Sequence, residues 1–311
     1  MPCYKPLMAL IRQDPSKSGT GSKKTVTFPK GVPSADVARH GTPTPLPCGQ
    51  CVGCRLERSR QWAIRLTKEL KLHDRSSFLT LTYDDDHLPR LPNGTPTLVL
   101  DDIQKFLKRL RKDQGLNKIR FFQCGEYGEL TKRPHHHMIL FGTAFDKDRK
   151  PTHASRSGFP QYESVSLNKL WGKGNCTISE VTFESAAYCA RYILKKITGK
   201  GSRFFYNGRK PEFVTMSRRP GIGSAYFDEY KDDMYPNDLI IPDIGRPESL
   251  PPKYFDRLLE KVDKPLFDKV KKNRTEGLDF WTDKNSTDTR LATRERLVER
   301  LIKNCLPRNQ E

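Results

Sequence analysis

The chain has 311 residues and a formal net charge of +19, because 56 lysines and arginines outnumber 37 aspartates and glutamates. Hydrophobic residues make up 35%, which predicts a modest core surrounded by long polar segments. This charge favours a polyanionic partner, most often nucleic acid, although a merely soluble basic protein can have the same composition. No apolar run approaches the ~20 residues of a membrane helix, and the N-terminus does not resemble a secretion signal. We therefore expect a protein without membrane association, located in the reducing cytoplasm.

Residues 1–54 are predicted to form a cysteine-containing segment with a flexible loop. Residues 14–47 are rich in Pro, Gly, Ser, Thr and Lys and have no sustained periodicity. The candidate ligands of a structural metal in this segment are Cys3, Cys48, Cys51 and Cys54. Four thiolates could hold Zn²⁺, three could hold an iron–sulfur cluster, and reduced, buried thiols remain the alternative.

From residue 55 onward, the pattern predicts the order α-β-α-β-β, a loop, and then β-α. The first helix follows the cysteines and the second covers residues 100–115, with Asp101 as its N-cap and Gly115 at its end. Residues 143–175 read as a loop, and Ser185 is the expected cap of a helix over 186–197. The predicted strands are 76–83, 118–128, 133–142 and 176–183.

Strands that follow each other closely in sequence tend to pair antiparallel, which favours an α+β fold with helices packed on a central sheet. Beyond residue 205, only residues 251–262 and 289–306 have a regular pattern, in both cases helical. We therefore predict a catalytic or binding domain over residues 55–225 and a helical C-terminal region of unknown role over residues 226–311.

Three consecutive histidines begin the strand "RPHHHMILFG". Alternate side chains of a strand share a face, so His135 and His137 are expected to point one way and His136 the other. A hairpin with the preceding strand would return Glu126 or Glu129 beside the two imidazoles. Two histidines and one carboxylate suit Mn²⁺ or Mg²⁺, and also Zn²⁺, although such a pair is often only structural.

The predicted helix "YCARYILKK" carries two tyrosines and two lysines. At 100° per residue, Tyr188, Tyr192 and Lys195 share one face, with Lys196 to one side, although an ordinary amphipathic helix has the same pattern. A phenol becomes a plausible nucleophile toward a phosphodiester when a divalent ion polarises the phosphate. A lysine beside it could stabilise the negative charge that develops.

These motifs together resemble those of rolling-circle replication initiators of the HUH endonuclease class. "PHHHMIL" looks like their His-hydrophobic-His motif, "FLTLTYDDDHLP" like their first motif, and "YCARYILKK" like the two-tyrosine motif of initiators from small single-stranded DNA phages. "PCGQCVGCRLERSRQWAIR", "CGEYGELTKRPHHHMILFG" and "MSRRPGIG" are similar to segments of the replication-associated proteins of gokushoviruses, a branch of the microviruses. The resemblance extends from the N-terminus to about residue 225.

The resemblance implies a fold, a reaction and partners. The implied fold is a ferredoxin-like antiparallel sheet flanked by helices. The implied enzyme nicks single-stranded DNA at the phage origin by tyrosine attack, which leaves a 5′-phosphotyrosine and a 3′-OH. A host polymerase extends that hydroxyl, and the second tyrosine allows the strand to be rejoined as a circle. The location implied is the cytoplasm of a bacterial host. No Gly-x₄-Gly-Lys-Ser/Thr loop occurs, so strand opening would depend on supercoiling or a host helicase.

Basic side chains near these motifs are the predicted DNA contacts, although such runs are usually only solvated surfaces. They are Arg65, Lys68, Arg218 and Arg219. Two other functions remain open. A conjugative relaxase or transposase shares the histidine motif and could use Tyr4 as its nucleophile, whereas a non-catalytic, zinc-containing regulator would bind DNA without cutting it.

Overall fold

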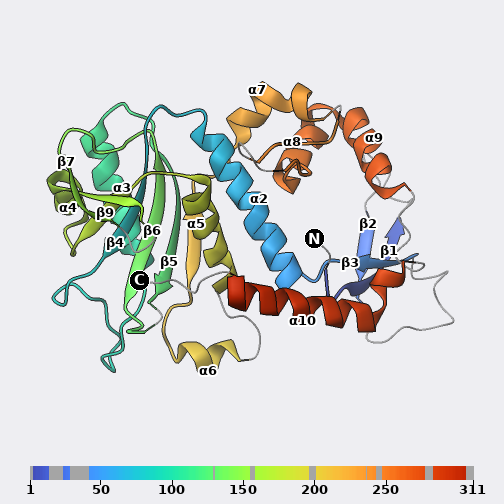
Figure 1. The fold of residues 1–311 in the computed structure, drawn as a ribbon, viewed down its shortest axis with the longest axis horizontal. Helices are drawn as coiled ribbons and strands as arrows, with labels where there is room; N and C mark the ends of the chain where they lie inside the picture. Colours follow the sequence, from blue (N-terminus) through green and yellow to red (C-terminus); the bar gives the residue numbers. More distant parts are fainter. Residues whose placement is uncertain are drawn as a thin grey trace. The chain divides into compact units, whose positions relative to one another are not determined.

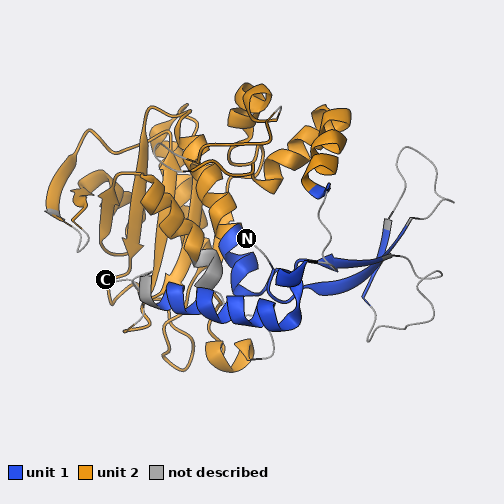
Figure 2. Ribbon diagram, turned by 45° about the vertical axis from the view of Figure 1, so that its right-hand side comes forward, with its two compact units in different colours: residues 1–57, 275–308 blue, residues 58–274, 309–311 orange. Residues whose placement is uncertain are grey.

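The computed structural model divides the chain into two compact units, coloured separately in Figure 2: residues 1–57 with 275–308, and residues 58–274 with 309–311. The predicted boundaries at residues 54 and 225 stay a prediction. The structure describes residues 3–13, 24–28, 42–128, 130–154, 158–195, 201–235, 237–242, 247–276 and 283–305. Within these ranges, no helix is both long and apolar enough to cross a membrane.

A seven-stranded sheet forms the centre of the larger unit (Figure 1). Each described pairing between neighbouring strands is antiparallel, so the predicted α+β class with a central antiparallel sheet is confirmed. From one edge to the other, the strands are β10 (Phe213–Met216), β5 (Arg120–Tyr127), β6 (Pro134–Phe141), β4 (Ser76–Thr82), β9 (Cys176–Ser179), β8 (Pro160–Ser164) and β7 (Arg149–Ala154).

Helices cover both faces of this sheet (Figure 1). Helices α3 (Leu100–Gln114) and α4 (Val165–Trp171) pack on one face, where Met138 and Leu140 of β6 point. Helices α2 (Val52–Leu70) and α5 (Phe183–Lys195) pack on the other face, with Ile139 and Phe141. Because β6 lies inside the sheet and between helices, its eight residues are all buried.

The rest of the larger unit is mainly helical. Its elements are α6 (Ser202–Tyr206), α7 (Ser224–Met234), α8 (Lys253–Val262) and α9 (Lys264–Thr275). Three of these four helices, α7, α8 and α9, pack on α2. Phe227, Phe255 and Val270 bury an apolar cluster against Ile64 of α2. The two helices predicted beyond residue 205 are present as α8 and, in the smaller unit, α10 (Asp288–Cys305), and α7 and α9 add to them.

The smaller unit contains a three-stranded sheet and a long helix. The sheet has the order β2-β1-β3, with β1 (Leu7–Gln13), β2 (Lys24–Thr27) and β3 (Thr42–Leu46). A short 3₁₀ helix, η1 (Lys284–Ser286), precedes α10 (Asp288–Cys305). Tyr4, Cys51 and Leu291 form a small buried cluster, which is a limited apolar core among the described residues of this unit.

Several local predictions were wrong. The supposed loop at 143–175 contains β7, β8 and α4, and the described parts of the supposed loop at 14–47 contain β2 and β3. Helix α3 begins at Leu100, after Val99, so Asp101 lies in its first turn and is not the cap, whereas Gly115 does end the helix. Residue 183 belongs to α5 and not to the preceding strand, because α5 begins earlier than expected.

Candidate metal and nucleophile site

Glu126, His135 and His137 lie side by side on adjacent strands. The antiparallel register of β5 and β6 pairs Glu126 with His135 and Cys124 with His137. Because residues two apart in a strand share a face, both imidazoles point to the side of the sheet covered by α5. The hairpin thus brings one acidic side chain and two histidines together from separate parts of the sequence.

The three side chains converge on a single carboxylate oxygen. Glu126 Oε1 is 2.7 Å from His135 Nε2 and 3.0 Å from His137 Nε2. Neighbouring ligands on an ion about 2.1 Å away would be separated by ~3.0 Å at a right angle, so these spacings fit a divalent ion. A set of two imidazoles and one carboxylate suits Mn²⁺ or Mg²⁺, and also Zn²⁺, and it leaves other coordination positions for water or phosphate oxygens.

The outer nitrogens of both histidines have partners that orient the rings. His135 Nδ1 lies 3.3 Å from the carbonyl oxygen of Arg133, and His137 Nδ1 lies 3.1 Å from Thr80 Oγ1. Histidines that bind metals usually make such a contact through the nitrogen that does not bind the ion, and it fixes which nitrogen is available. Thr80 is opposite His137 in the pairing of β4 with β6, and Phe78 stacks on the same ring.

Glu126 is completely buried, and burial by itself disfavours its charge. Hydrogen bonds from His135 and His137, together with their positive charges when protonated, outweigh this penalty, so the pKa of Glu126 lies well below its usual value. The carboxylate is therefore already ionised at neutral pH, as a metal ligand must be.

His136 points to the opposite face of the sheet and has a different environment. Its Nε2 lies 3.1 Å from the hydroxyl of Tyr83, and its Nδ1 lies 3.0 Å from the amide nitrogen of Gln123. Burial, with smaller contributions from the charges of the two neighbouring histidines, lowers the pKa of His136 to about 3. Its neighbour across the strands is Gly125, where an added Cβ would lie 3.0 Å from His136 Nδ1.

Helix α5 presents Tyr188 to this site. Small or thin side chains on its buried side, Ala186 and Cys189, let the helix pack closely on β5 and β6. The ring of Tyr188 is centred 5.3 Å from the ring of His137 and 6.2 Å from that of Phe78. A phenol therefore lies next to the candidate metal ligands.

The N-terminus of α5 is fixed by a pair of hydroxyl side chains. The N–H of Thr182 donates to Ser185 Oγ at 2.8 Å, and the N–H of Ser185 donates to Thr182 Oγ1 at 3.2 Å. Such reciprocal bonds satisfy N–H groups that lack a partner in the first turn. Ser185, expected as the cap, therefore takes part in capping from inside the helix, and Thr182 precedes the helix.

Other predicted residues of this site are described only in part. The backbone of Tyr192 and Lys195 belongs to α5, but their side chains lie outside the described residues, as do Lys196 and Glu129 altogether. Sequence reasoning missed Thr80, Phe78 and the carbonyl of Arg133, which contact the two histidines. The alternation in "SSFLTLTY" puts Phe78 and Thr80 on one face, but it does not show which strand lies beside β4.

The four predicted cysteine ligands also come together. The sulfur atoms of Cys3, Cys48, Cys51 and Cys54 all lie within 4.8 Å of one another. Tyr4, the alternative nucleophile, packs against this cluster and is only 6% exposed. Burial raises its pKa, which makes the phenol harder to ionise.

Two of the predicted DNA contacts are interior groups. The guanidinium of Arg65 lies 3.9 Å from the ring centres of both Trp62 and Tyr254, and it donates two hydrogen bonds to the carbonyl of Ile222. Lys68 is 3% exposed, and its Nζ is 5.2 Å from the ring centre of Tyr226. By contrast, Arg218 and Arg219 are exposed after β10.

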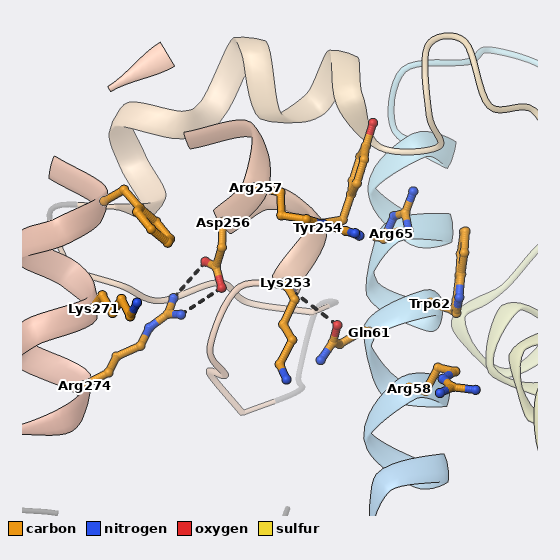
Figure 3. A pocket seen from close by; sticks show the side chains of 11 residues that line it. Arg58, Gln61, Trp62, Arg65, Lys253, Tyr254, Asp256, Arg257, Lys271 and Arg274 are labelled. Carbon is orange, nitrogen blue, oxygen red and sulfur yellow. Dashed lines mark hydrogen bonds and ion pairs between the residues drawn. The ribbon is translucent and has the colours of Figure 1, made fainter. Parts of the chain in front are cut away.

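Arg65 also borders a pocket of about 580 Å³ between α2, α8 and α9 (Figure 3). Asp256 in its wall is held by Arg274, which leaves positive charge in excess. Four exposed cations surround the pocket: Arg58, Lys253, Arg257 and Lys271. Cations beside the rings of Trp62 and Tyr254 are the chemistry that binds phosphates and bases of an unpaired strand.

The chain is similar to known proteins over most of its length. Residues 76–197 match the family model described as replication-associated protein ORF2/G2P. Replication-associated protein ORF2 of Spiroplasma virus 4 is 39% identical over 74% of this chain and 72% of its own. Replication-associated protein VP4 of Bdellovibrio phage phiMH2K is 31% identical over 78% and 75%, and ORF4 of Chlamydia phage 1 is 33% identical over 70% and 54%.

No solved structure matches the chain. The matched residues include Glu126, the three consecutive histidines and all of α5. The identity and coverage of the first two relatives are high enough to assign the family. The chain therefore belongs to the replication-associated proteins of small bacteriophages.

Proposed function

We propose that this protein starts rolling-circle replication of a small phage genome by nicking single-stranded DNA at its origin. Tyr188 or Tyr192 attacks one phosphodiester, which joins the tyrosine to the 5′-phosphate and frees a 3′-OH. A host polymerase would extend this hydroxyl, and a host helicase would open duplex DNA ahead of it. The reaction would take place in the cytoplasm of the infected bacterium.

The observation that carries this proposal is the distance between the candidate ligands and a phenol. The ring of Tyr188 is 5.3 Å from that of His137, whose Nε2 shares Glu126 Oε1 with His135. A phosphate oxygen held at the Glu126–His135–His137 cluster would therefore be close to the phenol. Attack requires this arrangement, because the nucleophile must be positioned within a few ångströms of phosphorus.

Each residue has a distinct part in the proposed reaction. Glu126, His135 and His137 would hold the divalent ion, and Thr80 and the Arg133 carbonyl keep the imidazoles oriented. When bound, Mn²⁺ or Mg²⁺ supplies Lewis-acid chemistry that polarises the phosphate and lowers the barrier to attack. Lys195 and Lys196 are the proposed cationic partners of the phenolate, the phosphate or the departing oxygen.

The bonds balance without an energy-rich cofactor. The bond from the tyrosine oxygen to phosphorus forms while the bond from phosphorus to O3′ breaks, and overall the phenol proton passes to O3′. In the reverse direction, a 3′-OH attacks the phosphotyrosine and releases the enzyme. Tyr188 and Tyr192 are four residues apart on α5, so one helix face offers two nucleophiles for successive cleavage and rejoining.

The basic surface supports binding of the DNA strand. We propose that Arg218, Arg219 and the four exposed cations around the α2–α8–α9 pocket contact phosphates of the DNA strand. Arg65 and Lys68 are not among the proposed direct contacts to DNA, because both side chains are buried. Arg65 supports the rings of Trp62 and Tyr254 from between them.

The proposal predicts which part of the cleaved strand becomes joined to the protein, and end-labelled DNA tests this prediction. An origin-containing oligonucleotide is labelled at its 3′ end in one sample and at its 5′ end in another, then incubated with protein and Mn²⁺ or Mg²⁺. We expect protein that carries the 3′ label through denaturing electrophoresis, and a shortened 5′-labelled strand that a polymerase can extend. EDTA should abolish both products.

Protein that carried the 5′ label instead would contain a 3′-phosphotyrosine, and this result would refute the mechanism. Salt-sensitive binding that leaves the oligonucleotide intact in both samples would instead favour the non-catalytic regulator. The relaxase alternative requires Tyr4 as nucleophile, and its side chain is buried beside the cysteines. An adduct that survives in the Tyr188→Phe/Tyr192→Phe variant and is lost in Tyr4→Phe would favour it.

A further inference from the structure

The cysteine cluster of the smaller unit has the dimensions of a tetrahedral metal site. Four sulfurs placed ~2.3 Å from one zinc ion are separated by ~3.8 Å along each edge of the tetrahedron. The Sγ atoms of Cys51 and Cys3 are 3.8 Å apart, and all four sulfurs lie within 4.8 Å of one another. This separation is also far too long for a disulfide, in which the sulfurs lie about 2.05 Å apart.

Backbone N–H groups point at these sulfurs. The N–H of Cys48 donates to Cys3 Sγ at 3.2 Å, that of Tyr4 to Cys51 Sγ at 3.3 Å, and that of Cys51 to Cys48 Sγ at 3.2 Å. An N–H donor stabilises a thiolate more than a thiol, because its dipole faces the negative charge. The loop around Cys48 and the residues after Cys3 are thus arranged for negatively charged sulfur.

The four cysteines come from three separate segments of the smaller unit. Cys3 precedes β1, Cys48 follows β3, and Cys51 and Cys54 lie at the N-terminus of α2. Around them the buried apolar cluster is small, with Leu291 and Val298 of α10 packed against the cysteines. Small domains that cannot bury enough apolar surface are commonly stabilised by a structural metal.

We propose that Cys3, Cys48, Cys51 and Cys54 bind one structural Zn²⁺ that fastens the start of β1, the end of β3 and the start of α2 to one another. Four protein thiolates complete a tetrahedral shell and leave no position for a substrate, so the ion has a structural and not a catalytic role. Iron–sulfur clusters place two or four irons between the thiolates and need wider separations than those observed.

The proposal is independent of the nicking reaction, and its test removes the other candidate metal site. Full-length His135→Ala/His137→Ala protein is purified under reducing conditions, and its metals are measured by mass spectrometry. We expect about one zinc per chain. Adding Cys48→Ser/Cys51→Ser should lower the zinc content at least tenfold, whereas Cys176→Ser, which changes a cysteine of the larger unit, should leave it unchanged.

A spectroscopic measurement covers the case in which the cysteine variant does not fold. Cobalt replaces zinc in the His135→Ala/His137→Ala protein, and we expect the strong thiolate-to-cobalt absorption and intense visible bands of a tetrahedral tetrathiolate site. Less than a tenth of a zinc per chain, with no such cobalt bands, would overturn the proposal. Iron and inorganic sulfide in its place would overturn the choice of zinc in favour of an iron–sulfur cluster.

Discussion

The two faces of β6 carry the same side chain in two different environments. On the α5 side, the Nε2 atoms of His135 and His137 both meet Glu126 Oε1. On the α3 side, His136 has neutral partners at both ring nitrogens, Tyr83 and Gln123. Neighbouring residues of one strand thus differ in chemistry because the pleat sends them to opposite sides. The acidic partner on one face makes a candidate metal site, and the neutral network on the other makes a structural core.

The largest expected effect comes from the phenols on the α5 side. Tyr188→Phe/Tyr192→Phe should reduce formation of the covalent protein–DNA adduct by more than about 1,000-fold, because no phenol remains to attack. The assay is denaturing electrophoresis with labelled origin DNA. Tyr83→Phe is the matched control on the opposite face, since its hydroxyl bonds only Asp102 and His136 among its described contacts. Equal loss in both variants would contradict the division between the faces.

A second comparison replaces histidines on the two faces. His137→Ala should lower the cleavage rate by about 100-fold or more, because it removes a ligand from the candidate metal site, while the folded state persists. His136→Ala should lower the free energy of unfolding by about 2–4 kcal/mol, since it leaves a cavity and unpaired polar groups. Cleavage rates at several Mn²⁺ concentrations and urea denaturation separate these effects. Severe loss of metal response in folded His136→Ala, with His137→Ala unaffected, would reverse our assignment.

The glycine opposite His136 provides a smaller, purely steric test. In Gly125→Ala the new Cβ would meet His136 Nδ1 at 3.0 Å and side-chain atoms of Leu98 and Phe213 at 3.1 Å. Such overpacking should cost about 1–3 kcal/mol of stability. Gly201→Ala is the control, because nothing lies within 4 Å of its added Cβ. Denaturant unfolding of the two variants measures the difference, and equal stability would mean that the packing around His136 is loose.

The mildest test uses pH. Because the pKa of His136 is lowered to about 3 in the folded protein and is ordinarily about 6.5, the unfolded chain binds the proton more tightly. Stability from this group is complete above pH 6.5 and decreases as pH falls toward 3, by about 1.4 kcal/mol at pH 5.5. The contribution from Glu126, whose pKa is also lowered, is lost only below its unfolded value near 4.5.

The measurement compares wild-type and His136→Gln unfolding free energies in EDTA between pH 7.5 and 5.5. The glutamine keeps hydrogen-bonding capacity but does not titrate, so its curve should be flatter by about 1.4 kcal/mol. Parallel curves for the two proteins would show that His136 keeps an ordinary pKa in the folded state.

The features of the two faces of β6 that depend on local periodicity could be predicted from the sequence. Alternation along β6 separated His136 from its neighbours, and the short connection from β5 brought Glu126 into the predicted hairpin. The partners from distant strands and helices could not be found in this way. Thr80 reaches His137 only because β4 pairs with β6, and Tyr83 reaches His136 from the end of the same strand.

The missed strands share a physical cause. β7, the edge strand, reads "RKPTHA" and β8 beside it reads "PQYES", polar sequences that lack the apolar alternation of a buried strand. Charge was equally ambiguous for Arg65. Its sequence position on a basic helix indicated a surface contact, whereas the folded chain encloses its guanidinium between Trp62 and Tyr254.

The central claim is that a tyrosine of α5 attacks DNA beside the Glu126–His135–His137 cluster. It is tested most directly by isolating the covalent adduct, digesting protein and DNA, and locating the nucleotide-bearing residue by mass spectrometry. We predict a phosphonucleotide on Tyr188 or Tyr192, formed only when Mn²⁺ or Mg²⁺ is present. A modified Tyr4, or DNA cleavage with no modified tyrosine at all, would contradict the account.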